Sequence, residues 1–355
     1  NPSNSKVISA LQELMCDKDF CTLYSLFMLA LARKELSACS FRLFIGEKPN
    51  IIPVMNEDLS TETTEEELKE AVVDERGVKY SKDGRKLLKS PKVLIGAYSV
   101  KEGTRIICDR AFLGCRSLSE IVIPSSVTSI GDGAFSWCRS LSEIVIPSSV
   151  TSIGDSAFCG CSSLIYISIP KSVFGLNGNP FAKWNGKLEC LSPNFVYEDD
   201  VLFNKDKSRI ISFRNQNIKS YVIPSSVTSI GDYAFSYCDS LSEIVIPSSF
   251  TSIGDYAFSS CRSLSEIVIP SSVTSIGKGA FSCCDSLSEI VIPSSVTSIG
   301  DRAFYGCCSL SEIVIPSSVT SIGDRAFLGC SFPNNLRQEL ISRFGDKIFS
   351  FTLNI

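Results

Sequence analysis

The chain contains 355 residues, of which 44% are hydrophobic and 20% charged, so it is long and apolar enough to bury a substantial core. Its formal net charge of −4 argues against nucleic acid or an anionic membrane as a partner, because both require clustered Lys and Arg. Histidine is absent, which excludes Ser-His-Asp and Cys-His catalysis, Glu-x-x-His di-iron sites and His-ligated zinc.

The first 70 residues carry helical periodicity, which predicts a helical N-terminal region over residues 1–70. The most apolar run, Phe20 to Ala32, is shorter than the roughly 20 residues that span a bilayer, and Arg33 and Lys34 close it. We therefore expect a buried helix there and no membrane span in the chain. The stretch LSTETTEEELKEAV has the form of an acidic helix that begins with a capping box.

Two stretches of the chain predict β-hairpins. The segment GVKYSKDGRKLL, residues 77–88, alternates in polarity and bends at Lys82-Asp83-Gly84. A shift of 123 residues aligns it without a gap with DVLFNKDKSRII, residues 200–211. We therefore expect a hairpin or cap over residues 71–94 and a hairpin insertion over residues 187–217.

Between and after these hairpins, a segment of 23 residues recurs along the chain. LSEIVIPSSVTSIGDGAFSWCRS begins at Leu118. Close copies begin at Leu141, Leu241, Leu264, Leu287 and Leu310, and weaker copies near Ile95, Leu164 and Ile218. The L-x-x-I-x-I core of each copy fits the strand signature of a leucine-rich repeat, which predicts a stack of about nine coils.

Each copy also predicts the course of one coil. Alternation turns Leu118 and Ile121 inward and leaves Glu120 and Val122 outward on a concave sheet. Asp132 is predicted to be the N-cap of a short helical turn, and its column has a structural role. The same aspartate recurs as Asp155, Asp232, Asp255, Asp301 and Asp324.

The predicted fold is an α+β solenoid, a right-handed leucine-rich repeat coil with β-hairpin insertions, a helical N-terminal region and a C-terminal cap. After residue 330, the sequence predicts a helix in LRQELISRFG and a last strand in IFSFTL. The predicted divisions are residues 1–70 (helical region), 71–94 (hairpin or cap), 95–186 (first repeat block), 187–217 (hairpin insertion), 218–330 (second repeat block) and 331–355 (C-terminal cap).

The chain has 16 cysteines, and eight of them fall in one column of the repeat. These are Cys115, Cys138, Cys161, Cys238, Cys261, Cys284, Cys307 and Cys330. Because side chains of stacked coils point in parallel, the geometry favours free thiols in the core over disulfides. Paired C-x-x-C spacing is absent, so we predict no metal site and no cofactor.

Two columns of outward side chains are candidates for partner binding. Like-charged glutamates on neighbouring strands form an acidic stripe, which is either a solvated face inherited by duplication or a surface that attracts a basic partner. Valines beside them suit a protein-binding surface. The acidic candidates are Glu120, Glu143, Glu243, Glu266, Glu289 and Glu312; the apolar column is Val122, Val145, Val245, Val268, Val291 and Val314.

A second candidate surface lies where the copies differ, at the residue after the aspartate and the residue before the cysteine. Four positions apart, these two residues would share an outward face of a helical turn. Aromatic and arginine side chains there have the composition of interaction hot spots, although tolerated surface variation is the alternative. The candidates are Trp137, Tyr233, Tyr237, Tyr256, Arg302 and Arg325.

The pattern L-x-x-I-x-IP-x-x-V-x-x-IG-x-x-AF-x-x-C, met almost in full by Leu118 to Cys138, resembles the BspA-like leucine-rich repeat proteins. The resemblance covers Ile95 to Cys330 and implies a bacterial cell-surface or secreted protein involved in adhesion. It carries no catalytic residues, since the family has no fixed catalytic motif.

These observations lead to a non-enzymatic binding protein, expected to be a monomer, that presents a curved repeat surface to a protein or a matrix glycoprotein. One alternative is a structural spacer or an intracellular scaffold whose repeats bind nothing. Another is an enzyme that uses the N-terminal helical region, for which a cavity with convergent charged groups in residues 1–90 would be needed.

Overall fold

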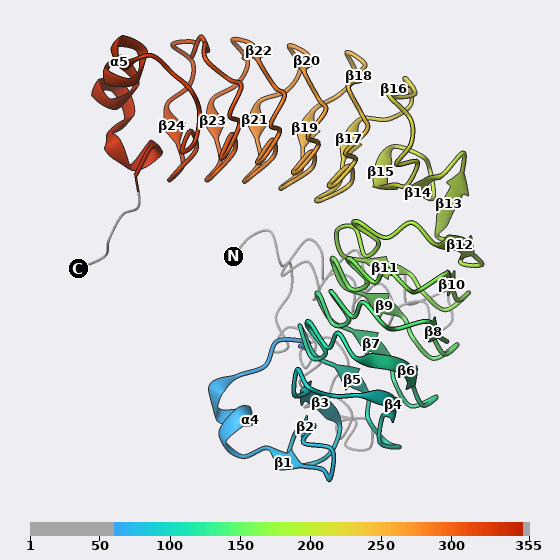
Figure 1. Cartoon of the computed structure of the whole chain (residues 1–355). Coiled ribbons are helices and arrows are strands. Elements are labelled where there is room, and N and C mark those ends of the chain that lie inside the picture. Colours follow the sequence, from blue (N-terminus) through green and yellow to red (C-terminus); the bar gives the residue numbers. More distant parts are fainter. Residues whose placement is uncertain (1–59, 351–355) are drawn as a thin grey trace, which may run out of the picture. The chain divides into compact units, whose positions relative to one another are not determined.

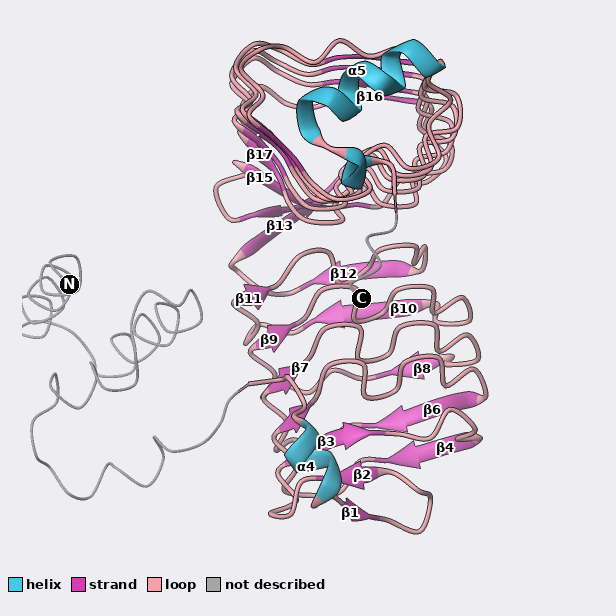
Figure 2. Cartoon of the chain, turned by 90° about the vertical axis from the view of Figure 1, so that its left-hand side faces the viewer, coloured by secondary structure: helices cyan, strands magenta, loops and turns pink. Residues whose placement is uncertain are grey.

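The computed structural model describes residues 60–350, so the helical prediction for residues 1–59 lies outside the described residues. The described residues belong to one compact unit, Ser60–Ile355. Within it, coils of 23 residues are stacked one on the next, with short strands on two sides of each coil (Figures 1 and 2). The predicted solenoid of leucine-rich repeats is therefore confirmed.

The longest ladders are built by the Ser-Ile pair of the T-S-I-G segment, and most of their strands run parallel. A seven-stranded sheet and an eight-stranded sheet contain these pairs, one in each repeat block. Their repeat strands are β5 (Ile106–Ile107), β7 (Ser129–Ile130), β9 (Ser152–Ile153), β11 (Gly175–Leu176), β17 (Ser229–Ile230), β19 (Ser252–Ile253), β21 (Ser275–Ile276), β23 (Ser298–Ile299) and β24 (Ser321–Ile322).

The predicted L-S-E-I-V strands are present, but they do not form one continuous sheet as expected. They form four short sheets, β4-β6-β8, β10-β12, β16-β18 and β20-β22. A proline follows most of these strands and removes an amide donor, so each strand has only two to five residues. The strands are β4 (Gly96–Ser99), β6 (Leu118–Val122), β8 (Glu143–Ile144), β10 (Tyr166–Ile169), β12 (Lys187–Cys190), β16 (Ser220–Val222), β18 (Glu243–Val245), β20 (Glu266–Val268) and β22 (Glu289–Val291).

The interior of the stack is a column of phenylalanine rings. Neighbouring rings from Phe112 to Phe181, and again from Phe213 to Phe327, lie 4.7 to 6.1 Å apart and stack at low angles. The repeated leucine, isoleucine, valine, alanine and cysteine side chains of most coils are buried around them. The core is therefore one repeated layer, in which each coil packs against the coil before and the coil after it.

The column cysteines are free thiols, and all but Cys330 are buried. In six coils the Sγ atom is within 3.1 to 3.2 Å of the carbonyl oxygen of the phenylalanine in the preceding coil, as for Cys138 and Phe112. Each thiol can thus donate a weak hydrogen bond to a buried carbonyl group. Cysteine therefore serves this core as a small apolar side chain with one donor.

The aspartate column has a structural role, but a different one from the predicted N-cap. The Asp132 carboxylate accepts the amide of Asp155 in the next coil at 2.8 Å, and the same bond recurs along both blocks. No helix follows, because the amides of Tyr233, Phe235 and Tyr237 donate to carbonyl oxygens of the next coil. Each aspartate therefore joins two coils rather than starting a helical turn.

Both hairpins are formed and lead into the Ser-Ile ladders. Strand β2 (Lys79–Tyr80) pairs antiparallel with β3 (Lys86–Lys89), which lies parallel to β5. In the insertion, β14 (Val201–Asn204) pairs antiparallel with β15 (Arg209–Phe213), which lies parallel to β17. Each hairpin thus supplies the first strand of a ladder. The remaining strands of this part are β1 (Val72–Val73) and β13 (Phe195–Glu198).

Two boundaries differ from the expected ones. Strand β12 lies parallel to β10, so Lys187–Cys190 continues the first repeat block instead of beginning the hairpin insertion. At the C-terminal end, helix α5 (Asn334–Phe344) follows Pro333 as predicted. The prediction of a last strand is wrong over residues 348–350, where the short helix η2 (Asp346–Ile348) and a turn end the described chain.

A small helix, α4 (Glu65–Lys69), opens the described chain with the predicted capping box. The Thr64 hydroxyl accepts the amide of Glu67, and the Glu67 carboxylate accepts the amide of Thr64. The same carboxylate forms an ion pair of 2.9 Å with the buried Lys86. The pKa of Glu67 is lowered, because the hydrogen bonds and the positive charge of Lys86 outweigh the effect of burial.

Candidate functional site

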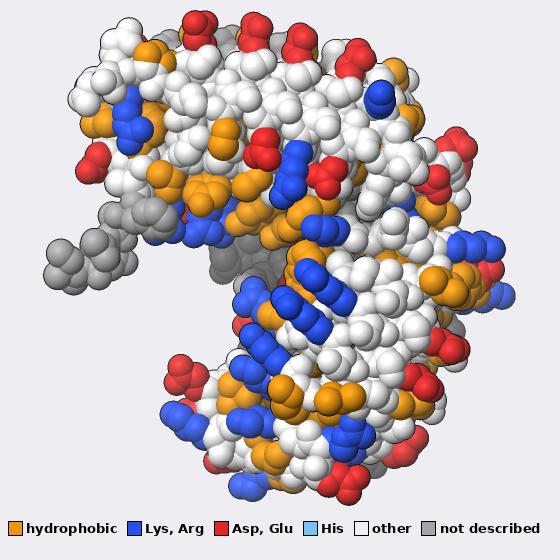
Figure 3. All heavy atoms as spheres, viewed as in Figure 1, with side chains coloured by type: hydrophobic (Ala, Val, Ile, Leu, Met, Phe, Trp, Pro, Cys, Tyr) orange, Lys and Arg blue, Asp and Glu red, His pale blue; other side chains and the backbone are white. Residues whose placement is uncertain are grey.

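The glutamate column forms an acidic row on the surface of both blocks. Figure 3 shows a row of acidic side chains along the coils of strands β18, β20 and β22. Glu266 lies in register with Glu289, and Glu120 with Glu143. Within residues 60–350, none of the six glutamates forms an ion pair. Like charges on neighbouring strands repel, so this row is an uncompensated negative surface.

The valine column lies beside the glutamates and is exposed to water. Val268 and Val291 are 64% and 61% exposed, although valine is commonly buried in proteins. The other members of the column are similarly exposed: Val122, Val145, Val245 and Val314, with Val222 of the weaker copy. The structure therefore brings the two predicted columns together as one surface of alternating acidic and apolar side chains, which we call the Glu-Val face.

The fourth coil of the first block, which begins at Leu164, interrupts this face. Where other copies read L-S-E-I-V, this coil has Leu164-Ile165-Tyr166-Ile167-Ser168. Isoleucine thus replaces serine, tyrosine replaces glutamate and serine replaces valine. The Tyr166 hydroxyl and the Ser168 hydroxyl both donate to the carboxylate of Glu189 on β12. The hydrogen bonds from these two side chains lower the pKa of Glu189.

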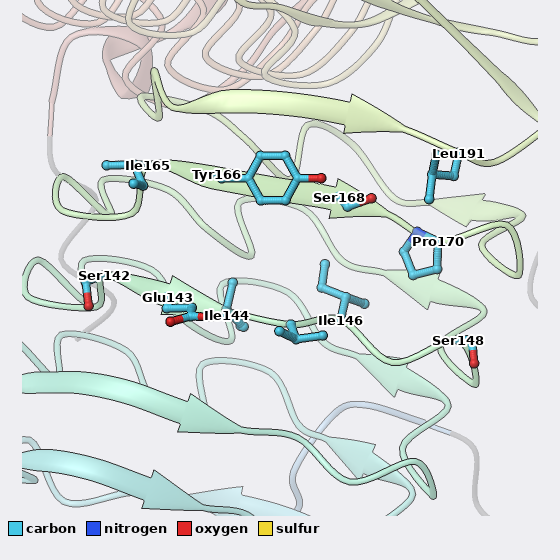
Figure 4. Close-up of a pocket in the computed structure, with 11 residues that line it drawn as sticks. Ser142, Glu143, Ile144, Ile146, Ser148, Ile165, Tyr166, Ser168, Pro170 and Leu191 are labelled. Carbon is cyan, nitrogen blue, oxygen red and sulfur yellow. The ribbon is translucent and has the colours of Figure 1, made fainter.

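A groove opens at this interruption, between β8 and β10 (Figure 4). No backbone hydrogen bond joins these two strands, whereas β8 pairs with β6 and β10 with β12. The groove has a volume of about 510 Å³. Its apolar lining includes Val145, Ile165, Tyr166 and Leu191, and Glu143 is its only charged lining residue. This composition suits an apolar group that carries a positive charge beside it.

Sequence reasoning did not find Ile165, Tyr166, Ser168 or Leu191 as site residues. The sequence did contain a signal, because the first three depart from columns that are otherwise copied almost unchanged. The repeat pattern does not show that β8 and β10 are unpaired, because this depends on the course of the backbone.

The second predicted surface has a different geometry from the expected helical face. Both variable positions have left-handed backbone conformations, with φ of 56° at Tyr233, 64° at Tyr237 and 54° at Tyr256. Trp137, Arg302 and Arg325 share this conformation. Bulky residues rarely adopt it, because Cβ crowds the neighbouring carbonyl oxygen. The prediction of an exposed aromatic patch is also wrong in part, since the four aromatic residues are half-buried.

Three of these aromatic residues lie where the two blocks meet. The Lys183 ammonium is 5.0 Å from the centre of the Trp137 ring and 4.6 Å from that of Tyr237. The Asn179 side chain donates to the backbone carbonyl of Tyr233 at 2.9 Å. Trp137 and Asn179 belong to the first block, and the tyrosines to the second. These side chains therefore hold the blocks together, which explains their partial burial.

The remaining candidates divide into a stacked pair and two arginines outside it. The rings of Tyr233 and Tyr256 stack with centres 4.8 Å apart, as expected for adjacent coils. The Lys278 ammonium lies 6.0 Å from the centre of the Tyr256 ring. Neither arginine is part of this stack: Arg302 is exposed and Arg325 is half-buried.

A carboxyl group at the block junction has a raised pKa. Burial of Asp155 raises its pKa to about 7, and the nearby carboxylates of Asp132 and Asp232 act in the same direction. The amide of Asn179 donates to the Asp155 carboxylate at 2.9 Å and limits the shift. Since the aspartate belongs to the inter-coil ladder, this shift has a structural origin and does not indicate a catalytic acid.

The left-handed backbone at Arg302 leads to a stability prediction. The variant Arg302→Gly should be about 1 kcal/mol more stable than Arg302→Ala, because glycine alone tolerates a φ of 55° without crowding. Chemical denaturation of the two variants measures the difference. At Glu289, on an exposed strand, the order should reverse, and alanine should be the more stable substitution. Equal stability of the two Arg302 variants would contradict the left-handed backbone conformation at this position.

Residues 60–350 contain no group of three or more Cys, Asp or Glu side chains that could hold a metal ion. None of the helices in that range is long and apolar enough to cross a membrane.

Comparisons with known proteins agree with this architecture. The model of the BspA-type leucine-rich repeat region matches residues 94–195 and 210–334. A leucine-rich cell surface protein from Faecalibacterium prausnitzii is 29% identical, with a TM-score of 0.56, over 73% of this chain and 82% of that one. A leucine-rich repeat protein from Eubacterium ventriosum is 27% identical, with a TM-score of 0.49, over 68% of this chain and 85% of that one. No curated protein matched.

Proposed function

This chain belongs to the BspA-type leucine-rich repeat family, and we propose that it is a non-enzymatic cell-surface protein that binds a protein or a matrix glycoprotein through its Glu-Val face. The family is one of surface leucine-rich repeat proteins that commonly take part in protein interaction and are not typically enzymes. The relative from Faecalibacterium prausnitzii, described as a cell surface protein, supports the proposed location.

The observation that carries this proposal is the uncompensated acidic row beside exposed valines. Unpaired glutamates in register on neighbouring strands repel each other, and nevertheless successive copies keep a glutamate at this position. A partner with Lys or Arg side chains would compensate these charges, and the valines would be removed from water in the same contact. In the second block the valine column covers five successive coils, from Val222 to Val314, which is a length of roughly 20 Å at a strand spacing of about 4.8 Å and is enough to contact several side chains of a partner.

The Glu-Val face is tested by neutralising three of its glutamates. The triple variant Glu243→Gln, Glu266→Gln and Glu289→Gln should bind a solubilised basement-membrane matrix about tenfold more weakly in 50 mM salt. Binding of the variant should also depend less on salt than that of the wild-type chain, because fewer charges are screened. Surface plasmon resonance at low and high salt measures both effects.

The matched control neutralises three exposed glutamates outside the face, Glu65, Glu66 and Glu75. This control lowers the negative charge by the same amount and should leave affinity nearly unchanged. If both triple variants behave alike, only net charge matters and the face is not the binding surface. A wild-type chain that captures no matrix protein would favour the spacer function, in which the repeats bind nothing.

A further inference from the structure

We propose that the groove between β8 and β10 is the anchor point of the Glu-Val face, and that it receives an apolar side chain flanked by Lys or Arg in an extended segment of the partner. This inference rests on the proposed function, since it assumes that the partner is a protein. It adds the chemistry by which that partner is recognised.

The copies of the repeat provide the first argument. The S-E-I-V sequence at this position is unchanged in the coils of β6, β8, β18, β20 and β22, whereas the coil of β10 has Ile165, Tyr166 and Ser168 instead. The core residues Leu164, Ile167 and Ile169 of that coil are kept and buried. The coil therefore retains what its fold requires and differs on the face that meets water.

The exposure of the lining residues provides the second argument. Ile165 is 76% exposed and Leu191 is 46% exposed, and both line a groove together with Val145 and Tyr166. Figure 4 shows Ile165 and Tyr166 at one part of the groove and Leu191 with Pro170 at the other. A cluster of apolar side chains around a concave surface is the usual form of a binding pocket. Its volume of about 510 Å³ leaves room for a leucine or phenylalanine side chain.

The charges around the groove determine the neighbours of that side chain. Glu143 lines the groove itself, and Glu120 lies in register with it on the adjacent strand. Glu189 lies on the other side, where Tyr166 and Ser168 hold its carboxylate. Lys187, on the same strand as Glu189, is the nearest opposing charge along β12. Among the residues that line the groove, Glu143 is the only charged one, and its carboxylate favours Lys or Arg beside the inserted group.

The arrangement also favours a chain over a small free molecule. The groove lies on an open sheet face and its lining includes Val145, a member of the exposed valine column. A ligand that filled only the groove would leave the adjoining valines and glutamates without a partner. An extended segment with apolar and basic residues in alternation can contact the groove and the columns at once, because its side chains also repeat every second residue.

The test uses the full chain and a set of synthetic eleven-residue peptides that differ in two features. The central residue is Phe, Leu or Ser, and the flanking charged residues are all Lys or all Glu. Affinity is measured by fluorescence anisotropy. For the wild-type chain, we expect the Lys peptides with central Phe or Leu to bind about tenfold more tightly than the Lys peptide with central Ser. Replacing the flanking Lys by Glu should weaken binding by a similar factor.

Two variants separate the groove from the charge. The variant Ile165→Ser, Tyr166→Glu and Ser168→Val restores the sequence of the other copies, so the coil should keep its fold. It should lose the preference for central Phe over Ser while retaining the preference for Lys over Glu. The variant Glu143→Gln should lose the preference for Lys over Glu while retaining the preference for central Phe over Ser. As a matched control, Lys278→Asp restores the copied residue of another column, outside the groove, and should behave like wild type.

The outcomes distinguish this inference from the proposed function. The inference would be overturned if the affinity of the peptides did not depend on the central residue. It would also be overturned if the variant with the restored coil still bound the peptide with central Phe more tightly than the one with central Ser. A preference for Glu peptides would overturn it as well. If matrix binding depends on Glu243, Glu266 and Glu289 while the peptides show no central preference, the proposed function stands and the anchor does not. If the peptides behave as expected but matrix binding ignores those glutamates, the anchor stands and the proposed function fails.

Discussion

Replacing Phe258 by alanine is expected to lower the free energy of unfolding by about 3–5 kcal/mol. The Phe258 ring is fully buried and stacks on Phe235 at 5.2 Å and on Phe281 at 5.4 Å. Removing the ring deletes buried apolar surface and leaves a cavity between two coils. The coils cannot approach each other to close this cavity, because the backbone hydrogen bonds of the ladders fix the distance between them. Urea denaturation followed by circular dichroism measures the loss.

The same variant tests whether the stack is cooperative. Since each coil contacts only its neighbours, a weak layer in the middle should broaden the transition or divide it into two steps. The control variant Phe258→Leu keeps most of the volume and should have a smaller effect, below about 1.5 kcal/mol. A loss below 1 kcal/mol for the alanine variant would show that the phenylalanine column is not the source of stability proposed for it.

The second large effect is expected at a glycine of the I-G-D segment. A Cβ atom added to Gly254 would lie 2.6 Å from Oδ1 and 2.8 Å from the amide nitrogen of Asp232 in the preceding coil. The Gly254→Ala variant should therefore lower the free energy of unfolding by about 3 kcal/mol, because a backbone atom cannot move aside. It should also weaken the bond between the Asp232 carboxylate and the Asp255 amide. Thermal and urea denaturation measure the change.

Gly175 is the matched control, because a Cβ atom there would be 3.5 Å from the nearest atom, the Cβ of Ser152. The Gly175→Ala variant should be as stable as the wild-type chain or up to about 1 kcal/mol more stable, since alanine restricts the unfolded chain. If both glycine variants are equally stable, the close approach of successive coils at Gly254 is incorrect.

The repeat itself was predictable from sequence because every copy gives the same answer. The 23-residue period, the inward Leu118 and Ile121, and the hairpin turn at Lys82-Asp83-Gly84 all follow from local pattern. Two features did not follow from pattern. Whether Asp132 caps its own turn or bonds the next coil depends on the distance between coils, and both choices leave the same sequence. The left-handed backbone at Tyr233 is similarly hidden, because this conformation is typical of glycine and a tyrosine gives no sign of it.

The site was predictable only in part. The glutamate and valine columns could be placed on one face, since strand alternation fixes which side chains point outward. The groove could not be predicted from the copied columns, because Ile165 and Tyr166 depart from those columns and the groove between β8 and β10 depends on the backbone. The contact of Lys183 with Trp137 and Tyr237 joins coils of different blocks, and no pattern within one coil predicts it.

The aspartate-to-amide bond between successive coils has a consequence for how such a chain can change over generations. The coils from Leu241 to Leu310 share the phenylalanine layer and the cysteine donor, and all of them except the coil of Lys278 carry the aspartate. A recombination event that removed or added one whole unit of 23 residues would therefore rejoin closely matching surfaces. The length of the second block is therefore adjustable in steps of one strand spacing, whereas the coil of Ile165 and Tyr166, which differs from the others, is not interchangeable.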